Sequence, residues 1–96
     1  MIKISGKQVV AARGLLEMTR EELAEACGLS VNTIWGLESS KRQAQQATVR
    51  TVVRELVARG IEFSNGTGLG VRLDFKRAQE YAASHPDQKA AIHTPE

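Results

Sequence analysis

The stretch Thr19–Glu38, TREELAEACGLSVNTIWGLE, decides the fold of this 96-residue chain. It opens with a capping box, a threonine followed three residues later by a glutamate, which predicts a helix over Arg20–Cys27. Gly28 suits the left-handed residue that ends a helix, and Ser30 can cap a further helix over Val31–Ser40. The stretch therefore predicts two short helices joined by a tight turn that contains glycine.

The apolar residues of this stretch indicate how the two helices pack. Leu23, Leu29, Ile34 and Leu37 occupy positions that would face a shared core. Ala24 lies four residues before the glycine of the turn, and its small side chain would let the two helices approach closely. This is the layout of a helix-turn-helix.

One further helix is expected on each side of this motif. Ser5 begins another capping box and predicts a first helix over Gly6–Glu17. A fourth helix is expected to begin near 44–48 and to end at Gly60. Its apolar residues recur with the spacing of one helical stripe: Val49, Val52, Val53, Leu56 and Val57.

The pattern changes after residue 60. Ile61–Ser64 and Val71–Phe75 alternate between apolar and polar residues, and six turn-forming residues separate them, which predicts a β-hairpin. Residues 76–84 could form a short helix, and the polar segment 85–96 is expected to be a mobile tail.

Composition narrows the classes of function. Hydrophobic residues make up 42% of the chain and charged residues 25%, as in globular domains. A single cysteine excludes an internal disulfide and a cysteine-rich zinc site. The absence of a long apolar run or an apolar leader favours a cytoplasmic setting. The formal net charge is +2, and the positive excess lies within residues 1–60.

The first two thirds of the chain resemble the lambdoid phage repressors and Cro, in the wider XRE-like family of transcription regulators. The resemblance covers about residues 4–60 and rests on four short motifs: E-L-A at 22–24, G-L-S at 28–30, T-I at 33–34 and L-E at 37–38.

The resemblance implies a mainly α fold. We expect a four-helix, repressor-like helix-turn-helix domain over residues 1–60. A β-hairpin, which a short helix could follow, would occupy residues 61–84 and serve dimerisation, and residues 85–96 would form the tail. The implied function is sequence-specific binding of double-stranded DNA by a homodimer on a palindromic site. Such a protein would be a repressor or autoregulator associated with the bacterial nucleoid.

The third helix carries the candidates for reading bases. With Ile34 facing inward and about 100° per residue, Asn32 and Gly36 point outward, Trp35 lies on a shoulder and Val31 near the boundary. Asparagine can bond two atoms of adenine, and valine can touch a thymine methyl group. The tryptophan could instead pack on a neighbouring helix, and the glycine could be a tolerated surface residue.

Candidates for phosphate contacts are cationic or hydroxyl side chains near the helix ends: Arg20, Ser30, Thr33, Ser39, Lys41 and Arg42. Each could equally be a solvated surface group. The phage repressors usually carry glutamine at the position of Arg20, so the arginine departs from their pattern. The resemblance also implies a partly buried, structural ion pair between Arg13 and Glu38.

The predicted hairpin has one apolar face, a candidate for dimerisation: Ile61, Phe63, Val71, Leu73 and Phe75. This face could meet a second copy, pack on the fourth helix of the same chain, or do both. A second hypothesis for function is a protein-interaction module of the same fold, antitoxin-like or an anti-activator, that does not read DNA. Trp35 would then lie in the partner surface.

Three further features carry no separate function. The glycines at 66, 68 and 70 lack the spacing of a nucleotide-binding loop and fit a hairpin turn. His85 and His93 stand apart from other metal ligands, and Cys27 fits an inert core thiol. We see no nucleophile beside a base, so neither an enzyme, a metal nor a cofactor is expected.

Overall fold

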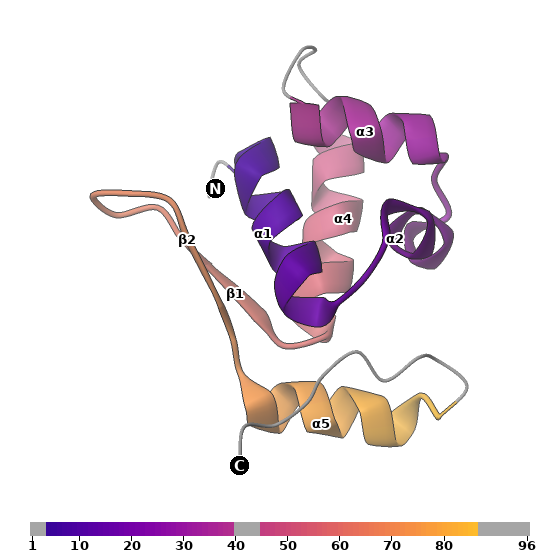
Figure 1. Cartoon of the computed structure of the whole chain (residues 1–96), viewed down its shortest axis with the longest axis vertical. Coiled ribbons are helices and arrows are strands. Elements are labelled where there is room, and N and C mark those ends of the chain that lie inside the picture. The colour runs from indigo at the N-terminus through magenta and orange to yellow at the C-terminus, as the bar shows by residue number, and fades with distance from the viewer. Residues whose placement is uncertain (1–3, 40–44, 87–96) are drawn as a thin grey trace.

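A computed structural model describes residues 4–39 and 45–86, and these form mainly helices with one antiparallel hairpin (Figure 1). The elements, in chain order, are α1 (Gly6–Leu16), α2 (Arg20–Cys27), α3 (Val31–Ser39), α4 (Gln46–Ala58), β1 (Ile61–Ser64), β2 (Gly70–Leu73) and α5 (Phe75–Ser84).

Local capping signals set the ends of the first helices. Ser5 and Thr19 both form complete capping boxes, which start α1 and α2 at the predicted residues. Gly28 ends α2 in the left-handed conformation, with φ 69°. The predicted end of α1 at Glu17 was one residue too long, because Glu17 itself adopts the left-handed conformation, with φ 55°.

The core lies where α1, α2, α3 and α4 meet, and it continues into the hairpin. Val52 and Leu56, from the predicted stripe of α4, are fully buried. Every fully buried large side chain is aliphatic, which fits a chain in which aromatic residues are only 4%: Val9, Leu16, Leu23, Ile34, Val52, Leu56 and Ile61.

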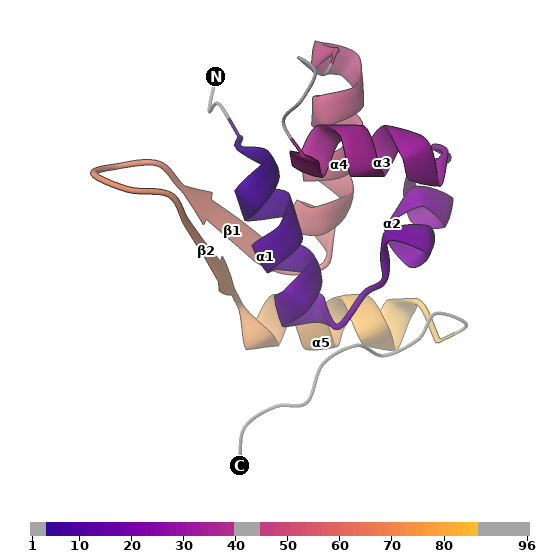
Figure 2. The same cartoon turned by 45° about the horizontal axis from the view of Figure 1, so that its top comes forward.

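The hairpin lies beside α1 in both views (Figures 1 and 2), and β2 packs directly against that helix. The two strands pair with Ile61 opposite Leu73 and Phe63 opposite Val71. Three expected boundaries are corrected: β2 begins at Gly70 and not at residue 71, it ends at Leu73 and not at Phe75, and α5 begins at Phe75 and not at residue 76.

Asp74 explains why the strand ends before Phe75 and why α5 begins at that residue. Its carboxylate accepts a hydrogen bond from the backbone N–H of Arg77 at 3.0 Å, as an N-cap does, so a helix begins where the alternation of residues favoured a strand. Gly60 precedes the hairpin with φ 105°, and a side chain there would meet the backbone of Asp74 and Ala78. The turn after α4 and the start of α5 are therefore in close contact.

Gln8 fixes the hairpin on α1. Its side chain is almost fully buried, and its Nε2 donates to the carbonyl oxygens of Ser64 and Gly70 and to Oδ1 of Asn65, at 2.9–3.1 Å. Its Oε1 accepts from the backbone N–H of Ser5. The side-chain amide of Gln8 thus caps α1 and also provides hydrogen-bond donors for the carbonyl groups where the two strands meet the hairpin loop. Within the described parts of the chain, no helix is long and apolar enough to cross a membrane.

Candidate functional site

The turn between α2 and α3 is held by backbone and hydroxyl hydrogen bonds. The N–H of Leu29 donates to the carbonyl of Ala24 at 2.9 Å, which completes the turn after Gly28. Ser30 Oγ accepts from the N–H of Thr33 at 3.1 Å, and the two hydroxyls are 2.8 Å apart. Two of the three hydroxyls predicted to contact phosphates, those of Ser30 and Thr33, therefore lie together at the first turn of α3.

Glu38 joins three helices through two arginines. Its side chain is only 2% exposed. Arg13, from α1, donates through Nε at 2.5 Å and through Nη2 at 3.0 Å, while Arg20, from α2, donates through Nε at 2.7 Å. The ion pair implied by the resemblance is present, and Arg20 adds a second cation that sequence reasoning assigned only to phosphate.

This arrangement controls the ionisation of the carboxyl group. Burial alone would raise the pKa of Glu38, but the hydrogen bonds and charges of Arg13 and Arg20 outweigh it, so that the pKa lies below its usual value. Glu38 is consequently ionised at neutral pH. The three side chains together carry one net positive charge at the start of α2.

Gly6 is a structural residue that the sequence analysis did not single out. A Cβ atom at Gly6 would collide with the backbone carbonyls of Leu37 and Glu38. The first turn of α1 therefore presses against the last turn of α3, and only glycine permits this approach. A capping box that begins with serine and glycine gives no sign of that distant contact.

The outward face of α3 is uncharged. Ile34 and Leu37 point into the core, whereas Asn32 is exposed and Trp35 retains 47% of its surface. A Cβ at Gly36 would meet no described atom within 4 Å, so the glycine is not required by contacts with the described residues. Helix α3 lies at the end of the molecule farthest from α5 (Figure 1).

Of the remaining candidates for phosphate contacts, Ser39 and Arg20 lie in the described part of the chain. Ser39 ends α3, and its hydroxyl donates to the carbonyl of Gly36 at 3.2 Å. Arg20 is partly exposed, and its terminal nitrogens make no hydrogen bond to the described residues. Lys41 and Arg42 lie outside the described residues.

The apolar face of the hairpin is part of the core. Ile61 is fully buried, and Phe63 and Leu73 pack against the core, so these residues are covered within one chain. Val71 is half-buried, and Phe75 belongs to α5 and not to the strand. This face therefore packs inside the chain, with α1 as well as α4 as the support, and a contribution of its partly exposed residues to dimerisation stays a prediction.

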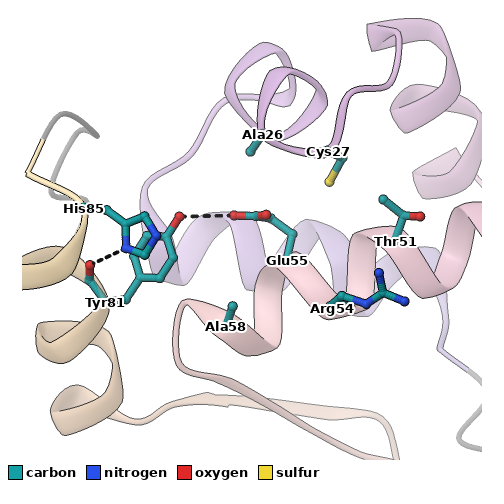
Figure 3. A pocket seen from close by; sticks show the side chains of 8 residues that line it. All are labelled: Ala26, Cys27, Thr51, Arg54, Glu55, Ala58, Tyr81 and His85. Carbon is teal, nitrogen blue, oxygen red and sulfur yellow. Dashed lines mark hydrogen bonds between the residues drawn. The ribbon is translucent and has the colours of Figure 1, made fainter.

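A shallow pocket of about 480 Å³ lies between α2, α4 and α5 (Figure 3). Burial, followed by the charge of Glu55, raises the pKa of the Cys27 thiol to about 11 despite the opposing charge of Arg59. The thiol is thus protonated at neutral pH and a poor nucleophile. The pocket lining comprises Ala26, Cys27, Thr51, Arg54, Glu55, Ala58, Tyr81 and His85.

The polar groups around this pocket attach α5 to α4. Tyr81 donates to Glu55 at 3.3 Å, and Arg59, which bonds the same carboxylate at 2.8 Å, lies over the Tyr81 ring. His85 stacks on that ring with centroids 3.9 Å apart. The part of the chain that the structure describes contains no group of three or more potential metal ligands.

The arrangement of α2 and α3 offers a neutral, polar helix face beside a partly exposed cation. Such a face can make hydrogen bonds and apolar contacts but holds no acid–base or nucleophilic pair among the residues described. No family model matches the chain, and no curated protein matches it at a significant level.

Proposed function

We propose that this chain is a sequence-specific DNA-binding regulator in which α2 and α3 form a helix-turn-helix. In this proposal residues 1–60 are a four-helix, repressor-like domain. Helix α3 enters the major groove, and Val31, Asn32, Trp35 and Gly36 approach the bases.

The observation that carries the proposal is the outward face of α3. Asn32 and Trp35 are exposed on a helix whose opposite face is anchored by Ile34 and Leu37. A Cβ at Gly36 would meet no described atom, so the backbone there could come close to a groove wall. In Figure 1, α2 is seen nearly end-on while α3 lies across the view, so the two helices are steeply inclined to each other. This suits a motif in which the second helix enters the groove while the first crosses the DNA backbone.

Phosphate contacts would then position the helix. The triad of Glu38, Arg13 and Arg20 leaves one net positive charge at the start of α2, where a helix also favours anions, and the terminal nitrogens of Arg20 make no hydrogen bond to a described residue. Ser30 and Thr33 place hydroxyls at the first turn of α3. Ser39, Lys41 and Arg42 complete the proposed set of backbone contacts.

The direct test is selection of the purified chain against a random duplex DNA pool at near-physiological salt. We expect an enriched inverted repeat, with half-sites about 10 base pairs apart or a multiple of that spacing, since a single module contacts too few bases to be specific. Weak, salt-sensitive retention without enrichment would overturn the proposal, because counterion release alone explains such binding.

A second function is favoured by one specific observation. Val31 and Trp35 are one helical turn apart on α3, and they retain 37% and 47% of their surface. Such an exposed apolar pair suits a protein partner, as in an interaction module that does not read DNA. Specific capture of a protein by the wild-type chain, lost in Trp35→Ala, together with no DNA enrichment, would select this alternative.

A further inference from the structure

The pocket between α2, α4 and α5 has the size of a small-molecule site (Figure 3). Its volume of about 480 Å³ lies within the range of roughly 300–1,000 Å³ that ligand pockets occupy. Ligand pockets usually combine apolar lining with a few convergent polar groups. Here the carboxylate of Glu55 and the guanidinium of Arg54, from consecutive residues of α4, are two such groups.

One carboxylate oxygen of Glu55 has no hydrogen-bond donor among the residues that the structure describes. Its Oε2 accepts from Arg59 at 2.8 Å and from Tyr81 at 3.3 Å, which hold the side chain in place in the middle of the lining (Figure 3). The side chain is only 22% exposed, so water reaches Oε1 less freely than it reaches a surface carboxylate. Such an oxygen favours a charged donor, because charge-assisted hydrogen bonds are stronger than neutral ones.

Arg54 supplies the opposite charge at one end of the pocket. Its side chain is exposed and lies beside Thr51, at the end farther from α5 (Figure 3). It forms no ion pair or hydrogen bond with a described residue, its neighbour Glu55 included. A guanidinium binds carboxylates well, since its planar donors match the two oxygens of the anion. The pocket thus has a cation beside a carboxylate, and the two are not paired with each other.

The lining away from Arg54 is rich in carbon. Ala26 and Ala58 lie above and below the Glu55 carboxylate in Figure 3, and their methyl groups make no hydrogen bonds. The stacked rings of Tyr81 and His85, with centroids 3.9 Å apart, stand at the end opposite Arg54. An apolar group placed at this end would be removed from water, which is favourable.

We infer that this pocket binds a free α-amino acid with an apolar side chain. The carboxylate of the amino acid meets the guanidinium of Arg54, its ammonium group donates to Oε1 of Glu55, and its side chain lies toward Ala58 and the stacked rings. The two charges of an α-amino acid are attached to one carbon atom, which suits counter-charges from adjacent residues of one helix. A simple carboxylate or a simple amine would use only one of the two contacts.

The bound amino acid contacts three helices at once, because the pocket is lined from α2, α4 and α5. A ligand that binds only when α5 is docked stabilises the docked arrangement by mass action. Helix α2 also belongs to the proposed helix-turn-helix, so occupation of the pocket alters DNA binding. This last step alone rests on the proposed function.

Amide NMR titration of the full chain with L-phenylalanine and L-leucine tests the binding without DNA. We expect saturable shifts that are largest at Cys27, Thr51 and Ala58, which line the pocket. Phenylpropionate lacks the ammonium group and phenethylamine lacks the carboxylate, so each should bind at least about tenfold more weakly than L-phenylalanine. Glycine, which lacks the side chain, should also bind about tenfold more weakly. These analogues test the Glu55 contact without changing a residue that also holds Arg59.

Arg54→Gln tests the orientation of the ligand. The variant should weaken L-phenylalanine and phenylpropionate about tenfold and leave phenethylamine unchanged, because only the carboxylate meets Arg54. The matched control is Arg50→Gln, since Arg50 is exposed one turn earlier on α4 and does not line the pocket. The inference is overturned if neither amino acid gives saturable shifts up to about 10 mM, if the shifts lie outside the pocket, if an analogue binds as tightly as L-phenylalanine, or if the two variants behave alike.

DNA binding separates this inference from the proposed function. If both hold, saturating L-phenylalanine changes the affinity of the wild type for its selected site and changes that of Arg54→Gln less. If the amino acid binds in the pocket but the chain selects no DNA sequence, the proposed function fails and the pocket assignment stands. If the chain selects DNA but binds no amino acid, the pocket assignment fails and the proposed function stands.

Discussion

Arg20 donates a hydrogen bond from Nε to the carboxylate of Glu38 at 2.7 Å, and this contact spans the turn between α2 and α3. Glu38 is buried, whereas the side chain of Arg20 retains 43% of its surface. The arginine thus has an anchored end and an accessible end. Its anchored end fixes α2 relative to α3, and its accessible nitrogens remain available to a phosphate.

Arg20→Ala should affect DNA binding more than folding. The free energy of unfolding should fall by no more than about 1 kcal/mol, because the Arg20 side chain is partly exposed and the buried Glu38 carboxylate keeps its two hydrogen bonds from Arg13. If Arg20 contacts a phosphate, affinity should fall similarly on all sequences, and the slope of log K against log salt should decrease by about one. Arg72→Ala, on an exposed cross-strand pair, is the control. An unchanged slope would remove Arg20 from the phosphate contacts.

Glu38→Gln should destabilise the fold strongly. It leaves the guanidinium of Arg13, which is only 15% exposed, without its anion, and breaking such a buried pair costs about 3 kcal/mol. The control is Glu62→Gln, whose partner Arg72 is 67% exposed. That variant should lose less than about 1 kcal/mol. Urea unfolding measures the free energy of unfolding of both variants. Equal losses of stability would show that the burial of the Arg13–Glu38 pair does not set the size of the effect.

The same carboxyl group predicts an acid-dependent stability. The pKa of Glu38 is lower in the folded chain than in the unfolded chain, so its contribution is present above the unfolded value of about 4.3 and is lost as the pH falls through the folded value. Urea midpoints measured from neutral pH downward should therefore show a wild-type advantage over Glu38→Gln that shrinks as the pH falls through the unfolded value and on through the lower folded value. An advantage that stays constant over this range would contradict the lowered pKa.

Gln8→Ala should loosen the hairpin. The variant removes the common donor to the carbonyls of Ser64 and Gly70, and because these carbonyls are only partly shielded from water, we expect a loss of about 1 kcal/mol. Amide hydrogen exchange in β1 and β2 should accelerate more than exchange in α4. The control is Gln79→Ala on the exposed side of α5. Uniform acceleration throughout the chain would mean that the hairpin does not open separately.

Local signals made much of the fold predictable. Capping boxes at Ser5 and Thr19 located the starts of α1 and α2, and the glycine of the turn located the end of α2. Asp74 shows a local conflict, in which an N-cap overrides the alternation that favoured a strand through Phe75. These outcomes depend on residues within a few positions of one another.

The long-range contacts could not be predicted in the same way. Gln8 reads as half of a capping box, and nothing near it indicates that its amide also meets Gly70, 62 residues away. Arg20 and Glu38 lie on either side of the turn between α2 and α3, so their contact depended on how these two helices are inclined. The burial of Ile61 likewise depended on how the hairpin packs against α4.

Asn32→Ala should reduce sequence preference while sparing nonspecific binding. Asn32 is exposed on α3, and an asparagine that bonds both N6 and N7 of adenine contributes about 1–3 kcal/mol of discrimination. Since Asn32 does not belong to the core, folding should be unchanged. Competition between the selected site and a scrambled duplex measures the preference directly. Equal loss on both duplexes would exclude base reading by Asn32, because only contacts to the DNA backbone weaken all sequences alike.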